Sequence, residues 1–183
     1  MFVVDTNVLL YAANGQCAEH DRCLRLVSEW RETEATWCVT WGILYEFLSV
    51  STHRKETAHA ASLSDSWRFI DGLLQSPGLQ VLTETDRHSA IVEATFAEVP
   101  GLSGRHLHDA HTAILMREHG ISRIVTRDTG FHRFPFLEVI DPLTGSWELH
   151  ESRPGGPNPY ARTRLAKSPR RPRVPASRPA GRR

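Results

Sequence analysis

The sequence predicts a three-layer α/β/α domain built around a central, mostly parallel sheet. Short apolar runs alternate with longer segments of helical periodicity, and the connections between them are short. Strands that alternate with helices form parallel sheets covered by helices, because a parallel connection needs a crossover segment of a dozen or more residues. Residues 1–151 contain no internal repeat, which argues against a repetitive architecture.

Each predicted element follows from a local pattern. Five short runs rich in apolar and β-branched residues are predicted strands, at residues 2–4, 37–40, 79–82, 123–126 and 137–140. Five longer segments are predicted helices, at residues 17–33, 41–51, 56–75, 86–99 and 107–119, and a short helical turn precedes the last strand. In the first helix, Cys23, Leu26 and Trp30 are spaced for one buried face.

Glycine and proline mark where the predicted helices end. The triplet Ser-Pro-Gly at residues 76–78, the pair Pro-Gly at residues 100–101 and Gly120 each follow a helical segment. In an open parallel sheet the functional crevice lies outside the carboxyl ends of the strands. The residues that directly follow each strand are therefore the candidates for a functional site.

The chain divides by composition into a folded part, residues 1–151, and a tail, residues 152–183. The tail holds seven of the 11 prolines, ten of the 22 Lys and Arg residues, and no acidic residue. Such a segment cannot bury enough apolar surface to offset its ordering entropy, so it is predicted to be a disordered basic tail. The remaining 12 basic residues stand against all 21 acidic ones, so the folded part has a net charge of −9. The overall charge of +1 therefore does not exclude a nucleic-acid partner.

The sequence argues against a membrane protein and against a secreted, disulfide-bonded one. The chain has no apolar run of about 18 residues, and Asp5 interrupts any signal-peptide core, so neither a membrane span nor secretion is expected. The three cysteines form no C-x-x-C pair and leave an odd count. A reducing, cytoplasmic location is the expectation.

Acidic residues stand near the ends of several predicted strands. Asp5 directly follows the first strand, and Asp128 follows the fourth by two residues. Asp109 lies in the first turn of the helix before the fourth strand, where the helix dipole favours a negative charge. Each of the three, taken alone, is also explained as an ordinary capping or turn residue.

Glu46 differs because it lies within the apolar run Ile-Leu-Tyr-Glu-Phe-Leu at residues 43–48. Its neighbours three and four residues away are mostly apolar or small, and they offer no Lys or Arg as a partner. A carboxylate on a core face is costly unless it is paired or binds a metal. The alternative is a glutamate that tilts towards solvent.

The four acids together suggest a metal site, because a parallel sheet would bring them to one edge. Four carboxylates in one cleft would raise each other's pKa values unless a cation neutralised them. An all-oxygen ligand set favours Mg²⁺ or Mn²⁺ over zinc. Such a site suits phosphodiester hydrolysis by a metal-activated water, with no side chain as nucleophile.

The motifs also resemble a known family. The segments MFVVDTNVLLYA, ILYEFLSV, LHDAHTAILMREHG and IVTRDTGFHRFPFLEVIDP resemble, in this order, the motifs of PIN-domain ribonucleases, and especially the VapC toxins of bacterial toxin–antitoxin pairs. The match runs from about residue 1 to residue 142, and four elements in the same order are quite specific. By this resemblance the catalytic, metal-binding residues are Asp5, Glu46, Asp109 and Asp128. The supporting polar residues are Thr6, Asn7 and Thr126.

The resemblance implies a PIN-like fold and a Mg²⁺- or Mn²⁺-dependent endoribonuclease that cuts single-stranded or loop regions of RNA, with tRNA or rRNA as possible targets. It also implies a homodimer and a cognate VapB-like antitoxin that inserts a segment across the active-site groove. The basic tail departs from the compact toxins of the family. A PIN-like nuclease that processes RNA without being a toxin is therefore a second interpretation.

Other interpretations compete with this one. His106, His108 and His111 suggest a transition-metal site, although no cysteine pair or H-E-x-x-H pattern accompanies them. An aspartyl-phosphate phosphatase would need a second aspartate where Asn7 stands. A non-enzymatic RNA-binding module would be favoured if one of the four acids were missing, and none is.

The tryptophans and the tail each allow two interpretations. Tryptophans can stack on unpaired bases, but Trp30, Trp37 and Trp41 fall in patterns that predict the core. The tail is either a solvated extension or an electrostatic tether for RNA whose contacts weaken steeply with salt.

Overall fold

A computed structural model of the chain describes residues 1–33, 35–53, 60–104 and 106–144. These residues contain a five-stranded sheet with the order β3-β2-β1-β4-β5, in which every neighbouring pair is parallel. The strands are β1 (Val3–Val4), β2 (Trp37–Thr40), β3 (Leu79–Leu82), β4 (Arg123–Val125) and β5 (Glu138–Ile140). The predicted α/β class is confirmed, and the predicted tail lies outside the described residues.

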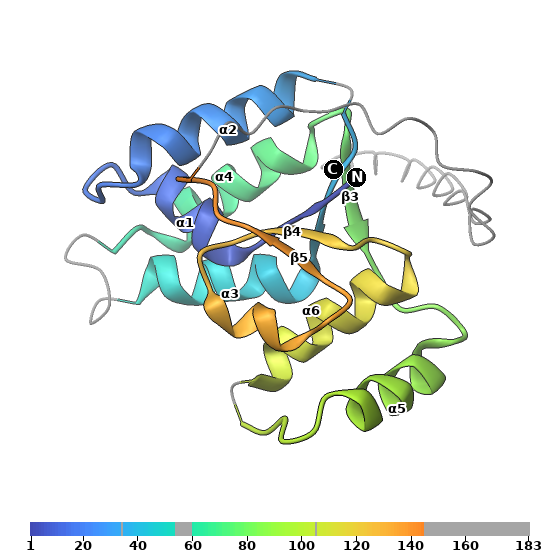
Figure 1. Ribbon diagram of the computed structural model, residues 1–183. Helices are drawn as coiled ribbons and strands as arrows, with labels where there is room; N and C mark the ends of the chain where they lie inside the picture. The colour runs from blue at the N-terminus through green and yellow to red at the C-terminus, as the bar shows by residue number, and fades with distance from the viewer. Residues whose placement is uncertain (34, 54–59, 105, 145–183) are drawn as a thin grey trace, which may run out of the picture. The chain divides into compact units, whose positions relative to one another are not determined.

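The strand order places a switch point at the centre of the sheet (Figure 1). The chain begins in the central strand β1, adds β2 and β3 on one side, and then returns to add β4 and β5 on the other. At such a point the connections leave the carboxyl ends of β1 and β4 towards opposite sides and open a crevice between them. The fold therefore offers one preferred location for a site.

The described residues form six α-helices and one short 3₁₀ turn. The helices are α1 (Thr6–Ala13), α2 (His20–Glu32), α3 (Trp41–Thr52), α4 (Leu63–Leu74), α5 (His88–Glu98) and α6 (His106–Glu118), and the turn covers Thr129–Arg133. Five of the helices fall on predicted segments. The sequence did not predict α1, because its eight residues are too short and too uniformly apolar to show helical periodicity.

Helix α4 begins later than predicted. The predicted helix began at residue 56, but the Ser62 side chain accepts a hydrogen bond from the backbone N–H of Asp65, 3.1 Å away, and so caps a helix that begins at Leu63. Residues 60–62 therefore precede the helix, and residues 54–59 lie outside the described part of the chain.

Aromatic side chains hold the helices to the sheet. The Trp30 ring of α2 lies 5.1 Å from that of Phe2 and 6.0 Å from that of Trp37, and both tryptophans are fully buried. In Figure 1, α2 and α4 lie on one side of the sheet and α6 on the other. Together with the all-parallel sheet, this arrangement confirms the predicted three layers.

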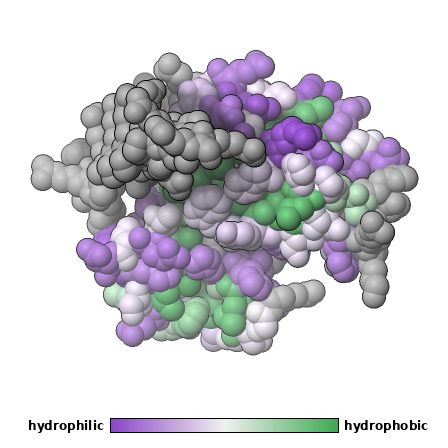
Figure 2. Space-filling view, turned by 180° about the vertical axis from the view of Figure 1, so that it is seen from behind, coloured by the Kyte–Doolittle hydropathy of each residue, from purple (hydrophilic) through white to green (hydrophobic). Residues whose placement is uncertain are grey.

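One predicted core residue is in fact at the surface. Trp41 is 42% exposed, since it is the first residue of α3 and packs its ring 6.1 Å from that of Tyr45. On the face shown in Figure 2, other apolar residues are also interspersed with polar ones at the surface. None of the described helices is long and apolar enough to cross a membrane.

Gly78 provides a test of the packing between β2 and β3. A Cβ atom at this position would overlap the backbone carbonyl oxygen of Ala35 and lie 3.2 Å from that of Thr33, so the backbone itself would have to move. We expect Gly78→Ala to lower the free energy of unfolding by about 1–3 kcal/mol, the usual cost of overpacking, as measured by urea denaturation. Gly15→Ala is the matched control, because its new Cβ would lie no closer than 3.9 Å to another group. Equal stability of the two variants would contradict this account.

Candidate active site at the carboxyl ends of the strands

Asp5 lies at the switch point of the sheet and ties three elements together. Its backbone N–H donates to the carbonyl of Val125, 3.1 Å away, which joins the end of β1 to β4. Its side chain caps α1 by accepting from the N–H of Thr6 through Oδ1 at 2.8 Å. The other oxygen, Oδ2, accepts from the Asn7 amide and from the Thr126 hydroxyl, each at 2.6 Å. The capping interpretation of Asp5 is therefore confirmed, and the same side chain lies where the sequence predicted a site.

The surroundings of Asp5 oppose its ionisation. The residue is only 7% exposed, and burial raises the pKa of its carboxyl to about 6. The hydrogen bonds from Thr126 and Thr6 lower this pKa, while the negative charges of Glu46 and Asp128 raise it further. The neutral donors therefore do not fully compensate the charge.

Glu46 reaches the same place from α3. Its Oε2 accepts a 2.6 Å hydrogen bond from the hydroxyl of Thr6, the first residue of α1. Glu46 is an exposed residue, so the prediction that it points at the core is wrong. Ile43, Leu44 and Phe47 form the buried face of α3, and Glu46 lies on the open side. The helix turns the carboxylate towards Asp5 without burying it.

Asp109 and Asp128 meet beside Gly130. A Cβ atom at Gly130 would lie 2.9 Å from Asp128 Oδ1 and 3.3 Å from Asp109 Oδ2. Asp128 caps the 3₁₀ turn by accepting from the Gly130 N–H at 2.7 Å, and its own N–H donates to Thr126 at 2.9 Å. The absence of a side chain at Gly130 thus lets both carboxylates approach one another.

The charge around Asp109 resembles that around Asp5. Burial, followed by the negative charge of Asp128, raises the pKa of the Asp109 carboxyl. His106 and Arg133 act in the opposite direction, but the pKa stays above its ordinary value. The nearest His106 nitrogen is 3.8 Å from Asp109 Oδ2. The structure brings Asp109 and Asp128 together beside Gly130, and links Asp5 to Glu46 through Thr6. Burial opposes the ionisation of Asp5 and Asp109.

The three predicted supporting residues connect these acids. Thr6 links Asp5 to Glu46, and Asn7 donates to both Asp5 and Thr126, the latter at 2.8 Å. Thr126 in turn accepts from the N–H of Asp128. This network fixes the relative positions of three carboxylates through uncharged side chains.

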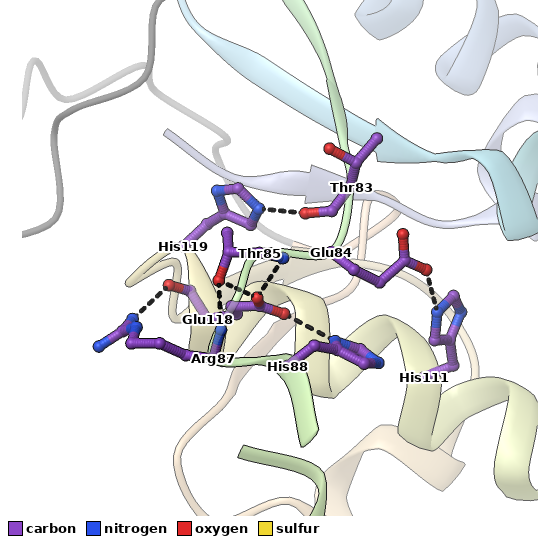
Figure 3. Close-up of polar contacts among 8 residues, drawn as sticks. All are labelled: Thr83, Glu84, Thr85, Arg87, His88, His111, Glu118 and His119. Carbon is purple, nitrogen blue, oxygen red and sulfur yellow. Dashed lines mark hydrogen bonds and ion pairs between the residues drawn. The ribbon is translucent and has the colours of Figure 1, made fainter. Parts of the chain in front are cut away.

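A second polar cluster, which the sequence did not predict, lies between the segment after β3 and α6 (Figure 3). Among the described residues, Glu84, His88 and His111 form the group of three potential metal ligands whose donor atoms all lie within 4.8 Å of one another. The four acids are spread more widely than this. The sequence places His111 beside His106 and His108, but its partners in the structure, Glu84 and His88, come from a different part of the chain. No spacing rule joins residue 84 to residue 111.

Comparison with known proteins gives consistent results. The PIN domain family matches residues 2–137. Ribonuclease VapC24 of Mycobacterium tuberculosis is 31% identical over 150 residues, which cover 79% of this chain and 98% of that protein.

Two solved structures share the fold. The crystal structure of Mycobacterium tuberculosis VapC20, described as a sarcin-ricin loop cleaving toxin, has a TM-score of 0.56 at 18% identity and covers 77% of this chain and all of that one. The crystal structure of VapBC2 from Rickettsia felis, bound to a DNA fragment from their promoter, has a TM-score of 0.54 at 18% identity and covers 75% of this chain and 96% of that one.

The raised pKa of Asp5 predicts how the metal-free protein responds to pH. A carboxyl whose pKa is about 6 in the folded state and 3.8 in the unfolded state favours folding when protonated, so this contribution is lost as the pH rises through about 6. In EDTA, we expect the wild type to lose thermal stability between pH 4 and pH 7 relative to Asp5→Asn, whose side chain does not titrate. If the melting temperatures of the two proteins changed in parallel with pH, ionisation of Asp5 would not destabilise the fold. Because the pH dependence of the two proteins is compared, any effect of the altered hydrogen bonds on stability that does not depend on pH cancels.

Proposed function

Because the chain belongs to the PIN-domain family, with a VapC ribonuclease as a relative, we propose that it is a metal-dependent endoribonuclease and the toxin of a VapBC-type toxin–antitoxin pair. The observation that carries this proposal is the convergence of Asp5, Glu46, Asp109 and Asp128 at the switch point of the sheet. A cluster of carboxylates at this location is suited to hydrolysing a phosphodiester bond with the help of divalent metal.

The donor set fits Mg²⁺ or Mn²⁺. All four acids offer carboxylate oxygens, which hard cations prefer, and the set includes no imidazole or thiolate. Burial raises the pKa values of the Asp5 and Asp109 carboxyls, and neighbouring carboxylates raise them further, so a bound cation would offset negative charge that is costly at this place. We propose that the four carboxylates hold the ion, with Asp5 as the most rigidly positioned ligand.

The ion, when bound, would supply the positive charge that acidifies water and stabilises the leaving oxygen of the phosphodiester. The chain itself would position this chemistry. Thr6 and Thr126 use their hydroxyls to hold Glu46 and Asp5, so neither is free to act as a nucleophile. Burial raises the pKa values of Cys23 and Cys38 to about 11 and about 12, which makes these thiols unreactive. Water is therefore the nucleophile that we propose.

The surface beside the acids is suited to unpaired RNA. Tyr45 directly precedes Glu46, is 66% exposed and packs its ring against the partly exposed Trp41. Exposed aromatic rings stack on single-stranded bases without strong sequence preference, at about 1–3 kcal/mol per base. Arg133 adds a positive charge near Asp109. We propose that single-stranded or loop RNA lies across this surface.

The partners are proposed from the same relationships. A VapB-like antitoxin is supported by the similarity of the fold to the VapBC2 assembly, and an rRNA target by the similarity to a toxin described as cleaving the sarcin-ricin loop. A homodimer and a tRNA target remain proposals that rest on family resemblance. A small DNA-binding protein encoded by the neighbouring reading frame would favour the toxin over a general RNA-processing nuclease.

Loss of one carboxylate tests the activity. We expect Asp5→Asn, measured on a structured RNA with Mg²⁺ or Mn²⁺, to lower the cleavage rate by about three orders of magnitude, because metal contributes several kcal/mol to the transition state. EDTA should abolish cleavage by the wild type. Asp71→Asn is the matched control, since Asp71 is an exposed residue of α4 whose side chain accepts a hydrogen bond from its helical neighbour Gln75. Full activity of a folded Asp5→Asn protein would refute the proposal.

Gly130 tests whether the positions of Asp109 and Asp128 matter. A methyl group at this residue would push on Asp128 Oδ1 and Asp109 Oδ2, while its backbone conformation is one that alanine can adopt. We expect Gly130→Ala to fold normally and to lose about 10- to 100-fold in cleavage rate, since shifts of about 1 Å have effects of this size. Thr129→Ala, in the same 3₁₀ turn, should stay close to the wild type. An unchanged rate for Gly130→Ala would mean that these two carboxylates do not act together.

A further inference from the structure

We propose that Glu84, His88 and His111 form a second metal site, which binds a divalent transition-metal ion such as Zn²⁺. Two imidazoles and one carboxylate are a donor set that zinc uses in proteins, whereas Mg²⁺ prefers oxygen ligands only. The proposal does not rest on the nuclease activity. It concerns different residues and a different class of ion from the acidic crevice.

The distances allow one ion to contact all three side chains. Their donor atoms already lie within 4.8 Å of one another, and Glu84 Oε1 is 3.2 Å from His111 Nε2. Zinc ligands lie about 2.0–2.2 Å from the metal, so tetrahedral ligand atoms are about 3.5 Å apart. The Glu84 and His111 side chains are 54% and 41% exposed, which leaves them free to close the remaining ångström by small rotations.

A buried carboxylate orients His88 for this role. Glu118 Oε2 lies 2.8 Å from His88 Nδ1, and the side chain of Glu118 is completely buried. The contact with Nδ1 turns the other ring nitrogen, Nε2, away from Glu118, so Nε2 is the atom that His88 would offer to a metal.

Glu118 is itself held in place. Both the backbone N–H and the hydroxyl of Thr85 donate to its Oε1, the former at 2.5 Å. Figure 3 shows the His88 ring directed from Glu118 towards His111. A carboxylate that bonds one nitrogen of a histidine while the other faces a cluster of donors is the usual arrangement around protein-bound zinc. The Glu118 carboxylate is buried and contacts the Thr85 N–H, the Thr85 hydroxyl and His88 Nδ1. An ion pair at the surface would not need a glutamate held this firmly.

The site would be distinct from the acidic crevice and would secure α5. Asp109 and His111 are two residues apart on α6, so their side chains leave the helix in different directions. Within α5, Thr95 is the one buried residue, and α6 is its main packing partner. A metal held by Glu84, by His88 at the start of α5 and by His111 of α6 would cross-link the segment after β3 to both helices.

Titration of the full-length protein with Co²⁺ and Zn²⁺ in excess Mg²⁺ tests this site. The visible absorption of bound Co²⁺ shows how many ligands surround the ion. The affinity for Zn²⁺ is measured by competition with a chromogenic chelator. We expect one ion to bind with micromolar or tighter affinity, and Zn²⁺ to raise the melting temperature. His111→Ala should weaken Zn²⁺ binding at least about tenfold and remove the thermal shift, because one of three ligands is lost. His111 is partly exposed, so this variant should fold.

Two control variants separate the outcomes. His108→Ala removes an exposed histidine of the same helix and should bind Zn²⁺ like the wild type. Asp128→Asn alters the acidic crevice and should also leave Zn²⁺ binding unchanged. If the wild type binds no more tightly than His111→Ala, or if Asp128→Asn abolishes binding, the proposed site does not exist. Glu118→Gln, checked for folding by circular dichroism, should weaken Zn²⁺ binding by about 10- to 100-fold while all three ligands remain.

Discussion

The structure depends on a buried carboxylate at the centre of the sheet. Asp5 joins β1 to β4 through its backbone, caps α1 through one oxygen, and accepts from Asn7 and Thr126 through the other. All of these donors are neutral, so they position the charge without cancelling it, and burial still raises the pKa of the carboxyl. The same bonds that hold the switch point together therefore also hold a carboxylate whose ionisation is opposed by burial.

Two local features, a threonine hydrogen bond and a glycine without a side chain, position the remaining acids near Asp5. Thr6 connects α1 to Glu46 of α3, and Gly130 lets Asp128 approach Asp109 because it carries no side chain. Two of the acids also have an ordinary role in local structure, since Asp5 caps α1 and Asp128 caps the 3₁₀ turn. Helix capping and cation binding both need a carboxylate oxygen held at the start of a helix. One aspartate, which has two such oxygens, can therefore take part in both.

Helix α6 connects two chemically different clusters. Asp109 contributes an oxygen donor to the acidic crevice, whereas His111 contributes an imidazole to the cluster with Glu84 and His88. Glu118, at the end of the same helix, is buried and supports His88. The donor types would keep hard and borderline cations apart, because carboxylates suit Mg²⁺ or Mn²⁺ and imidazoles suit zinc.

The sequence by itself determined the class of fold and the positions of all five strands, because periodicity is a local property. The residues near the strand ends are equally local, and they are what predicted the four acids as a site. The sequence could not reveal α1, which is too uniformly apolar to show a helical face, or the exposure of Trp41 and Glu46, which depends on how α3 is rotated against its neighbours. Only the tertiary structure brought Glu84 and His88 to His111. Their contact depends on how α5 and the segment after β3 pack on α6, and no spacing along the chain encodes that packing.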